Sequence, residues 1–255
     1  MRESLKERMR KREFTVGSWI TLAHTSIAEI MSQAGFDWLV VDMEHSAITI
    51  GEAQSLIQTI ELSGVTPLVR VGKNDSCIIK RVMDSGAHGV IVPMVNSRED
   101  AERAVKSVKY PPVGFRGVGL ARAQKYGAGF EQYKNWAEKE SIVVVQIEHI
   151  DAINNLEEIL TVKGVDGFIV GPYDLSGSLG KPGEFSDPSV LKALEKVKQL
   201  SAKHNALSGF HVVKPDLEDF KKKKEEGYRF IAFGLDTLFL GQTCRDLVSK
   251  LKISE

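Results

Sequence analysis

The run Ile142-Val-Val-Val-Gln-Ile147 decides the predicted fold, because every position except Gln146 is apolar. A strand that is apolar on both faces is typical of a parallel sheet covered by helices on both sides. Other short runs rich in β-branched residues recur along the chain. The predicted strands are Thr15–Thr21, Trp38–Val41, Thr66–Val69, Gly89–Val92, Ile142–Ile147, Gly167–Val170, Ala206–Phe210 and Arg229–Phe233.

Helical patterns fill the intervals between these strands. The clearest are Ile50–Leu62, Ser97–Val108 and Ser189–His204, and Asp187-Pro188 supplies the cap residue and first-turn proline of the last one. Glycines stand between helix and strand, as expected of helix C-caps, at Gly35, Gly64, Gly86, Gly164 and Gly227. This alternation, with no linker, predicts one domain over residues 1–255, a closed (β/α)₈ TIM barrel. An open doubly wound sheet is the alternative.

Length and charge limit the classes of function. The chain has 255 residues, with 34 Lys plus Arg and 34 Asp plus Glu, so its formal net charge is zero. Such a chain has no global positive field to attract nucleic acid or an anionic membrane. No apolar run approaches the roughly 20 residues that span a bilayer. The two cysteines, Cys77 and Cys244, fit a reduced cytoplasmic setting. Leu5 and Met9 are spaced for a short N-terminal helix on the barrel's end.

One segment interrupts the alternation of strands and helices. Residues Tyr110–Tyr133 form a long glycine-rich insertion before the fifth strand. Its Gly117-Val-Gly119 follows a proline-rich turn and not a strand, so it is only a fragment of a dinucleotide-binding motif. Long ordered loops in compact domains are often functional. We expect this insertion to form a mobile wall of an active site.

Polar residues gather where the predicted strands end, which is where barrel enzymes carry their chemistry. Glu148 and Asp174 end sequential strands and should be neighbours. Two carboxylates facing one point repel each other unless a cation lies between them or one of them is protonated. Two oxygen ligands suit Mg²⁺ or Mn²⁺, which keep waters and take further ligands from substrate. The alternative is that each carboxylate pairs with a nearby Arg or Lys; the neighbouring Gln146 and Arg70 favour the metal.

Three further features follow strands. Arg70 is a fixed cation suited to a carboxylate or an enolate oxygen, or else to a barrel-top ion pair. His45 lies three residues after Asp42, so a carboxylate can orient it as a base. The turn Gly171–Asp174 offers backbone N–H groups to an anion, or simply begins a helix. We expect Arg70→Ala and His45→Ala to fold normally and to be nearly inactive.

A lysine is absent from the predicted strands and their ends. Schiff-base aldolases need a desolvated lysine there. The nearest is Lys73, three residues after Arg70, and the run Lys221–Lys224 reads as the solvated face of a helix. Metal-assisted enolate formation is therefore the preferred chemistry.

Several motifs together resemble the HpcH/HpaI family, the metal-dependent class II pyruvate aldolases, from about Thr15 to Leu247. They are Phe36-Asp-Trp-Leu-Val-Val-Asp-Met-Glu-His45, Pro67-Leu-Val-Arg70, Val92-Pro-Met-Val95, Tyr110-Pro-Pro with Arg116-Gly-Val-Gly119, Val145-Gln-Ile-Glu148 and Val165-Asp-Gly-Phe-Ile-Val-Gly-Pro-Tyr-Asp-Leu-Ser176.

The resemblance implies roles for individual residues. Glu148 and Asp174 would bind a divalent metal, Mg²⁺ or Mn²⁺, with Co²⁺ as an alternative. Arg70 would stabilise the enolate. His45 would be the base, with Asp42 and Asp84 tuning it. Pyruvate would be held by Gln146 and by the backbone of the turn Gly171, Pro172, Tyr173 and Asp174.

The resemblance also implies a homo-oligomer, a hexamer built as a trimer of dimers, in which the last helix, about Asp236–Lys250, packs on a neighbouring subunit. Two positions depart from the family pattern. Tyr173 stands where a small residue is usual, and Phe210-His-Val-Val213 differs from the aliphatic version. Both put the natural aldehyde in question.

The hypothesis is reversible cleavage of a 4-hydroxy-2-oxo acid to pyruvate and an aldehyde through a metal-stabilised enolate. A glycosidase that uses Glu148 and Asp174 as acid and base is one alternative. An acyl-CoA lyase of the malyl- or citramalyl-CoA type is a second, and a non-catalytic barrel used for binding or assembly is a third.

Overall fold

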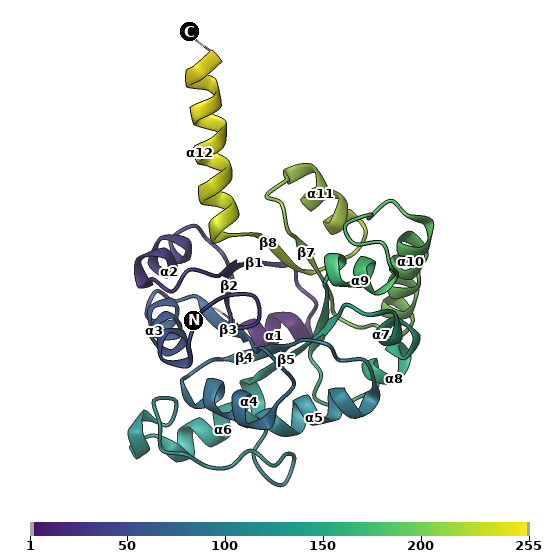
Figure 1. The fold of residues 1–255 in the computed structure, drawn as a ribbon. Coiled ribbons are helices and arrows are strands. Elements are labelled where there is room, and N and C mark those ends of the chain that lie inside the picture. The colour runs from purple at the N-terminus through teal and green to yellow at the C-terminus, as the bar shows by residue number, and fades with distance from the viewer. Residues whose placement is uncertain (1–2, 254–255) are drawn as a thin grey trace.

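The computed structural model describes residues 3–253. Parallel strands pair in sequence order, and β1 pairs with β8 through Thr15 and Phe230, so the sheet closes into a barrel (Figure 1). The prediction of a closed barrel is confirmed, and the open sheet is excluded. The strands are β1 (Thr15–Ile20), β2 (Trp38–Asp42), β3 (Thr66–Arg70), β4 (Gly89–Val92), β5 (Ile142–Ile147), β6 (Gly167–Val170), β7 (Ser208–Val212) and β8 (Phe230–Leu235).

Five strands have other bounds than predicted: β1 ends one residue earlier, β8 lies one to two residues further along, and the differences at β2, β3 and β7 are informative. β2 and β3 each run one residue further, because Asp42 pairs with Arg70 across the sheet. β7 lies two residues further along than predicted, because His211 and Val212 still pair with β8. In these three cases the predicted strand ended just before a polar side chain. The observed strand continues past that residue, because strand pairing uses only backbone groups.

Helices surround the barrel, and their local signals are satisfied. Thr49 and Glu52 form a capping box at the start of α3, and Asp187 caps α10. Gly35, Gly64 and Gly86 have the positive φ of helix C-caps. The helices are α1 (Leu5–Arg10), α2 (Thr25–Ser32), α3 (Ile50–Leu62), α4 (Ser76–Asp84), α5 (Arg98–Val108), α6 (Phe130–Glu140), α7 (Ile150–Asn154), α8 (Leu156–Leu160), α9 (Pro172–Ser178), α10 (Pro188–Lys203), α11 (Leu217–Glu225) and α12 (Asp236–Ile253), with a 3₁₀ turn at Lys125–Gly127.

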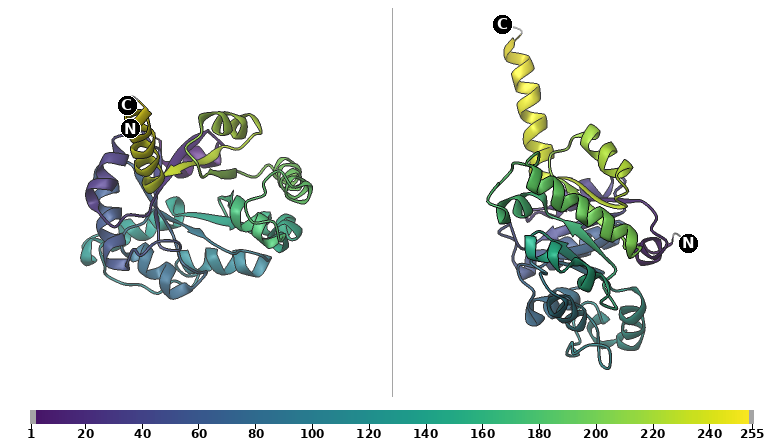
Figure 2. Two further views of the ribbon diagram at one scale, coloured as in Figure 1. Left: turned by 45° about the horizontal axis from the view of Figure 1, so that its top comes forward. Right: turned by 90° about the vertical axis from the view of Figure 1, so that its right-hand side faces the viewer.

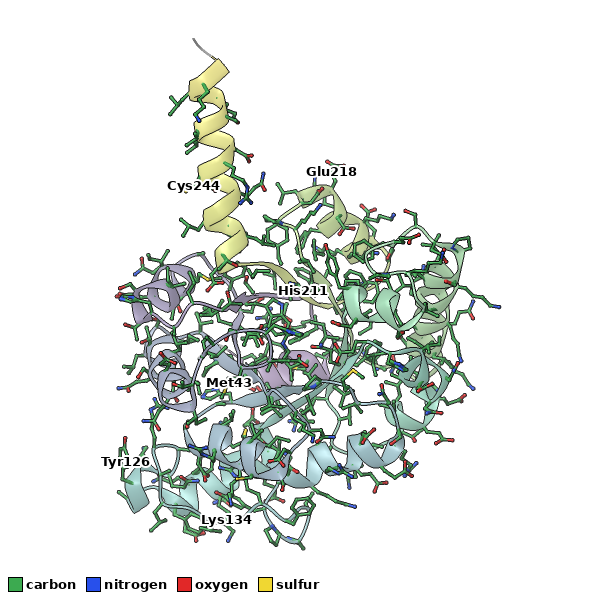
Figure 3. The ribbon with its side chains drawn as sticks, in the orientation of Figure 1. Met43, Tyr126, Lys134, His211, Glu218 and Cys244 are labelled. Atoms are coloured by element: carbon green, nitrogen blue, oxygen red, sulfur yellow. The ribbon has the colours of Figure 1, made fainter. Side chains whose placement is uncertain are left out.

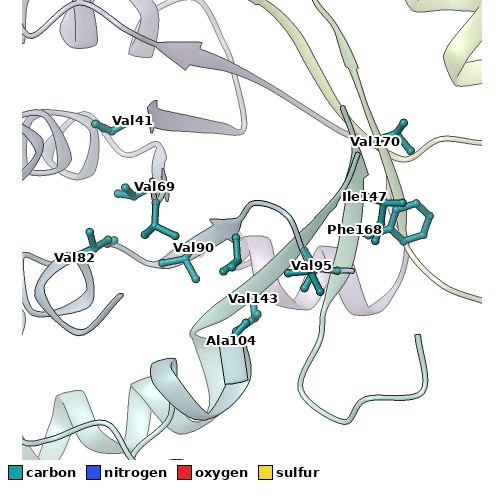
Figure 4. Packing of buried hydrophobic residues seen from close by; sticks show 14 of the residues in the cluster. Val41, Val69, Val82, Val90, Val95, Ala104, Val143, Ile147, Phe168 and Val170 are labelled. Atoms are coloured by element: carbon teal, nitrogen blue, oxygen red, sulfur yellow. The ribbon is translucent and has the colours of Figure 1, made fainter. Parts of the chain in front are cut away.

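The core has two layers because successive strand residues point to opposite faces. The outer layer lies between strands and helices and includes Val69, Val90 and Val143 (Figure 4). The inner layer fills the barrel. There Trp38 stacks on Phe230 with ring centroids 4.0 Å apart.

The predicted N-terminal helix is confirmed as α1. Its Leu5 and Met9 are buried in the inner layer and close the barrel at the amino-terminal ends of the strands. In Figure 1 α1 is seen behind the barrel, so the viewer faces the end at which the strands finish. The barrel is thus sealed at one end, and any opening lies at the other.

The insertion does not lie where it was expected. Its Arg116 is fully buried and binds Asp84 on α4 at 2.5 Å and the Tyr133 hydroxyl at 2.9 Å. The Ala123 N–H donates to the Asp84 carbonyl. Figure 3 shows Tyr126 at the rim of the molecule, far from His211 over the barrel. Within one chain, the insertion therefore packs on the outside against α4 and does not form a wall of the barrel mouth.

The last helix, α12, extends away from the barrel in each view (Figures 1 and 2). Its side chains Leu240, Leu247 and Leu251 are exposed. Across residues 3–253, none of the helices combines the length and apolar character needed to cross a membrane.

Candidate active site

A polar layer lies above the apolar interior of the barrel. Val40, Leu68 and Val144 point inward, so residues two positions further along these strands point inward as well. Those positions hold Asp42, Arg70 and Gln146, and the same alternation makes His211 inward-facing on β7. The strand ends therefore place polar groups around one opening, as the sequence predicted.

Arg70 and Asp42 form a bidentate ion pair at the centre of this layer. Arg70 Nε and Nη2 donate to the Asp42 carboxylate at 2.9 and 2.6 Å, and both side chains are buried. Burial alone would raise the pKa of Asp42, but the hydrogen bonds and charge of Arg70 lower it below its ordinary value. Asp42 is thus a permanent anion that fixes the guanidinium.

The expected pairing of Asp42 with the His45 ring is corrected by these contacts. Asp42 Oδ1 instead accepts the backbone N–H groups of Glu44 at 3.0 Å and His45 at 3.3 Å. The His45 side chain is 60% exposed, and its Nε2 lies 3.7 Å from Glu44. Asp42 therefore holds the loop that carries His45, while the imidazole itself is free to meet a substrate.

Asp84 lies elsewhere in the chain. Its carboxylate binds Arg116 and Gln124 at the end of α4. Within residues 3–253 no bond joins it to His45, so its proposed tuning of that histidine stays a prediction.

Glu148 follows β5 and is buried. Its Oε1 accepts the Met94 N–H at 2.7 Å, and its Oε2 accepts a short bond from the Gln146 amide. Burial raises the pKa of Glu148, and the charge of Asp174 raises it further. The two carboxylates predicted to share a site are thus close enough to repel each other.

A third acid, Glu44, joins this group. Its Oε2 is buried without a hydrogen bond, 3.4 Å from Arg70 Nε. Burial raises the pKa of Glu44 to about 7, and the charges of Glu148, Asp42 and Asp174 add to the rise. The sequence analysis did not select Glu44, because only the closed barrel brings it near the other acids.

These residues fit a divalent cation. The described chain holds no cluster of three or more His, Cys, Asp or Glu placed to bind a metal ion, so Glu148 and Asp174 can supply only part of a coordination shell. Asp42, Glu44 and Glu148 lie buried or partly buried around one arginine, Arg70. Oxygen donors with positions left for water and substrate suit Mg²⁺ or Mn²⁺.

The turn after β6 closes the site on one side. Gly171 caps α9, with Pro172 at its first position. A Cβ at Gly171 would lie 3.0 Å from Glu148 Oε2, so a larger residue at this position would crowd the Glu148 carboxylate. Tyr173 is half-exposed and packs edge-on against Phe185.

A cavity of about 290 Å³ opens between these groups. That volume is near the lower end of the range for small-molecule sites, roughly 300–1,000 Å³. Its lining joins seven of the ten predicted site residues to others that were not selected from the sequence, chiefly Trp19 and His211, whereas Asp42, Asp84 and Glu148 do not line it. The lining side chains are Trp19, His45, Arg70, Gln146, Ile169, Val170, Gly171, Pro172, Tyr173, Asp174, His211 and Val213.

Comparison with known proteins gives a consistent result. The chain is 35% identical to the hydroxypyruvate/pyruvate aldolase of Pseudomonas aeruginosa over 97% of its own length and 92% of that protein. It is 37% identical to the 2-keto-3-deoxy-L-rhamnonate aldolase of Escherichia coli K12, over 91% of this chain and 87% of the relative. A solved HpcH/HpaI family protein from Burkholderia cenocepacia J2315 superposes with a TM-score of 0.92 at 31% identity, covering 97% of this chain and 98% of that one. The model of the HpcH/HpaI aldolase/citrate lyase family matches residues 15–242, and the chain belongs to that family.

Proposed function

We propose that this protein reversibly cleaves a 4-hydroxy-2-oxo acid to pyruvate, or a close 2-oxo acid, and an aldehyde. The family supports a carbon–carbon lyase, and the relatives above are aldolases. One observation carries the proposal: two carboxylates, an amide and a guanidinium lie together at the open end of the barrel. They belong to Glu148, Asp174, Gln146 and Arg70.

Glu148 and Asp174 would hold the divalent metal. When bound, such an ion polarises the carboxylate and keto oxygens of a 2-oxo acid and makes the adjacent carbon acidic. Gln146 and the backbone of the turn at Gly171–Asp174 would bind and orient that acid. Because these groups sit on strand ends fixed by the barrel, their positions are set before substrate arrives.

Arg70 would stabilise the negative charge of the enolate, and His45 would accept the proton of the substrate. Asp42 accepts one N–H from Nε and one from Nη2 of Arg70, so the Nη1 N–H groups and the second Nη2 N–H would be available to the enolate oxygen as charge develops there. The exposed His45 imidazole would accept the C4 hydroxyl proton as the C3–C4 bond breaks. Pyruvate then forms when the enolate carbon takes up a proton.

The test is pyruvate proton exchange in deuterium oxide, measured by NMR with Mg²⁺ added. This assay detects the enolate without requiring the natural aldehyde. We expect exchange that EDTA abolishes and Mg²⁺ restores, and that Glu148→Gln loses. Glu225→Gln, the same change at an exposed carboxylate on α11, should retain it. Exchange that ignores the chelator would refute the proposed metal chemistry, and cleavage only of a CoA thioester would point to the acyl-CoA lyase.

We also propose that α12 packs on a neighbouring subunit of a homo-oligomer, which we expect to be a hexamer. Leu240, Leu247, Val248 and Leu251 are exposed along a helix that leaves its own barrel (Figure 2). Burial of such a helix against a second copy would remove this apolar surface from water. Light scattering after size exclusion should give the mass of an oligomer, and Leu247→Glu should lower it; a monomeric wild-type chain would refute the proposal.

A further inference from the structure

Trp19 and His211 lie together at the cavity, on β1 and β7. Their ring centroids are 5.2 Å apart, and the Arg70 guanidinium stacks 4.3 Å from the Trp19 ring. Both line the same cavity as Arg70, Gln146 and Asp174. Figure 3 shows His211 over the open end of the barrel. Neither residue has a part in the cleavage chemistry proposed above.

His211 lines this cavity and keeps one hydrogen-bond acceptor on its ring. Its Nε2 lies 3.4 Å from the Gly234 carbonyl oxygen, which can only accept a hydrogen bond, so Nε2 carries the proton. Nδ1 therefore keeps its lone pair. Burial and then the Arg70 charge lower the pKa of His211 to about 3, so the ring stays neutral at physiological pH.

Trp19 presents an unpaired donor. It is 2% exposed, and its indole Nε1 is buried without a hydrogen-bond partner in the described chain. A buried N–H left unpaired costs about 1–3 kcal/mol, so such groups in native proteins usually meet a water or a ligand. Because Trp19 lines the cavity, a molecule bound there can supply the partner that this N–H lacks.

We propose that Trp19 Nε1–H and His211 Nδ1 together bind a hydroxyl group of the substrate, so that the enzyme prefers hydroxylated substrates over their deoxy counterparts. A hydroxyl can accept from Trp19 and donate to His211 at once. An alkyl group would leave both groups unpaired, and a carboxylate would face the lone pair of Nδ1. This inference rests on the proposed aldolase function and specifies its substrate.

The hydroxyl could belong to either reaction partner, and two pairs of substrates distinguish them. The first compares glycolaldehyde with acetaldehyde, each with pyruvate. The second compares hydroxypyruvate with pyruvate, each with the same aldehyde. One lost hydrogen bond of this kind corresponds to about a tenfold change in kcat/KM. We expect at least that preference for the hydroxylated member in one pair.

The variants His211→Phe and Trp19→Phe test the assignment separately, since each removes one polar atom and keeps an aromatic ring. We expect the kcat/KM ratio of the preferred pair to fall to about one in both. His204→Phe, on the outside at the end of α10, should keep the wild-type ratio. Should one variant fail to fold, the other still gives the ratio.

The outcomes distinguish a failure of the hydroxyl assignment from a failure of the proposed aldolase function. Absence of pyruvate exchange in the wild type overturns the proposed function and this inference with it. Exchange with equal kcat/KM values in both pairs, or a preference that survives in the variants, overturns the hydroxyl assignment alone.

Discussion

Replacing Arg70 with alanine should now impair both stability and activity. Sequence reasoning expected normal folding, but the structure places Arg70 in a buried bidentate pair with Asp42. The substitution leaves a carboxylate buried without its counter-ion. The two backbone N–H groups of Glu44 and His45 still contact that carboxylate, at 3.0 and 3.3 Å, and compensate part of the loss.

The magnitude follows from the burial of the pair. Removing one partner of a buried ion pair typically costs 3–5 kcal/mol, and the remaining N–H donors place the expected cost at about 3 kcal/mol. In a chain of 255 residues that corresponds to a Tm lower by about 6–12 °C. The loss of one electrostatic contact to the enolate should lower pyruvate exchange by about 10²–10³-fold.

The cost should depend on pH with a defined sign. In the wild type, Arg70 lowers the pKa of Asp42, so the stability from this pair is present above the ordinary carboxyl range and lost as pH falls. In Arg70→Ala burial, the largest influence, raises the Asp42 pKa, and only the backbone N–H groups of Glu44 and His45 still oppose it. The variant therefore loses stability as pH rises through that raised value. The difference in unfolding free energy should therefore grow between about pH 5 and pH 8.

Urea denaturation at the two pH values measures this difference, with His45→Ala as the control. Since the His45 side chain is 60% exposed, its removal should change stability by less than about 0.5 kcal/mol while abolishing aldol cleavage. An Arg70→Ala protein as stable as wild type at both pH values would refute the assigned energy of the pair. Recovery of stability in Asp42→Asn/Arg70→Ala would support it.

Three other substitutions and one glycine control test the fold. Arg116→Met should cost about 1–3 kcal/mol in urea denaturation, because it removes the buried guanidinium from Asp84 and from the Tyr133 hydroxyl, while Gln124 still donates to Asp84. An unchanged midpoint would contradict the role given to that ion pair. Hydrogen bonds from His88 and Arg122 lower the pKa of Glu61 to about 2. Because solvent screens these contacts, Glu61→Gln should lower the unfolding free energy by only about 1 kcal/mol at neutral pH. That deficit should vanish as pH falls below the ordinary carboxyl range towards pH 2, and a constant deficit would disprove the linkage. In thermal melts Gly17→Ala should lower stability by at least about 1–3 kcal/mol, since its Cβ would overlap the Trp38 ring. In the control Gly51→Ala, in α3, the new Cβ meets nothing within 4 Å, so this variant should be neutral or stabilising.

Local sequence signals determined much of the fold. The bounds of β4, β5 and β6 agree with the prediction, as do those of α3, because apolar runs and capping residues act over only a few positions. The polar residues after the strands also identified the correct end of the barrel. Residues that follow parallel strands must meet at one edge, whatever the details of packing.

Only the tertiary structure decided which polar groups contact each other. Sequence spacing suggested Asp42 as the partner of His45, yet Asp42 pairs with Arg70, because adjacent parallel strands in register bring these two side chains together. Closure of the barrel likewise brought Trp19 on β1 beside His211 on β7, about 190 positions later. Such contacts depend on strand register and barrel closure, which join distant segments and leave no periodic trace in the sequence.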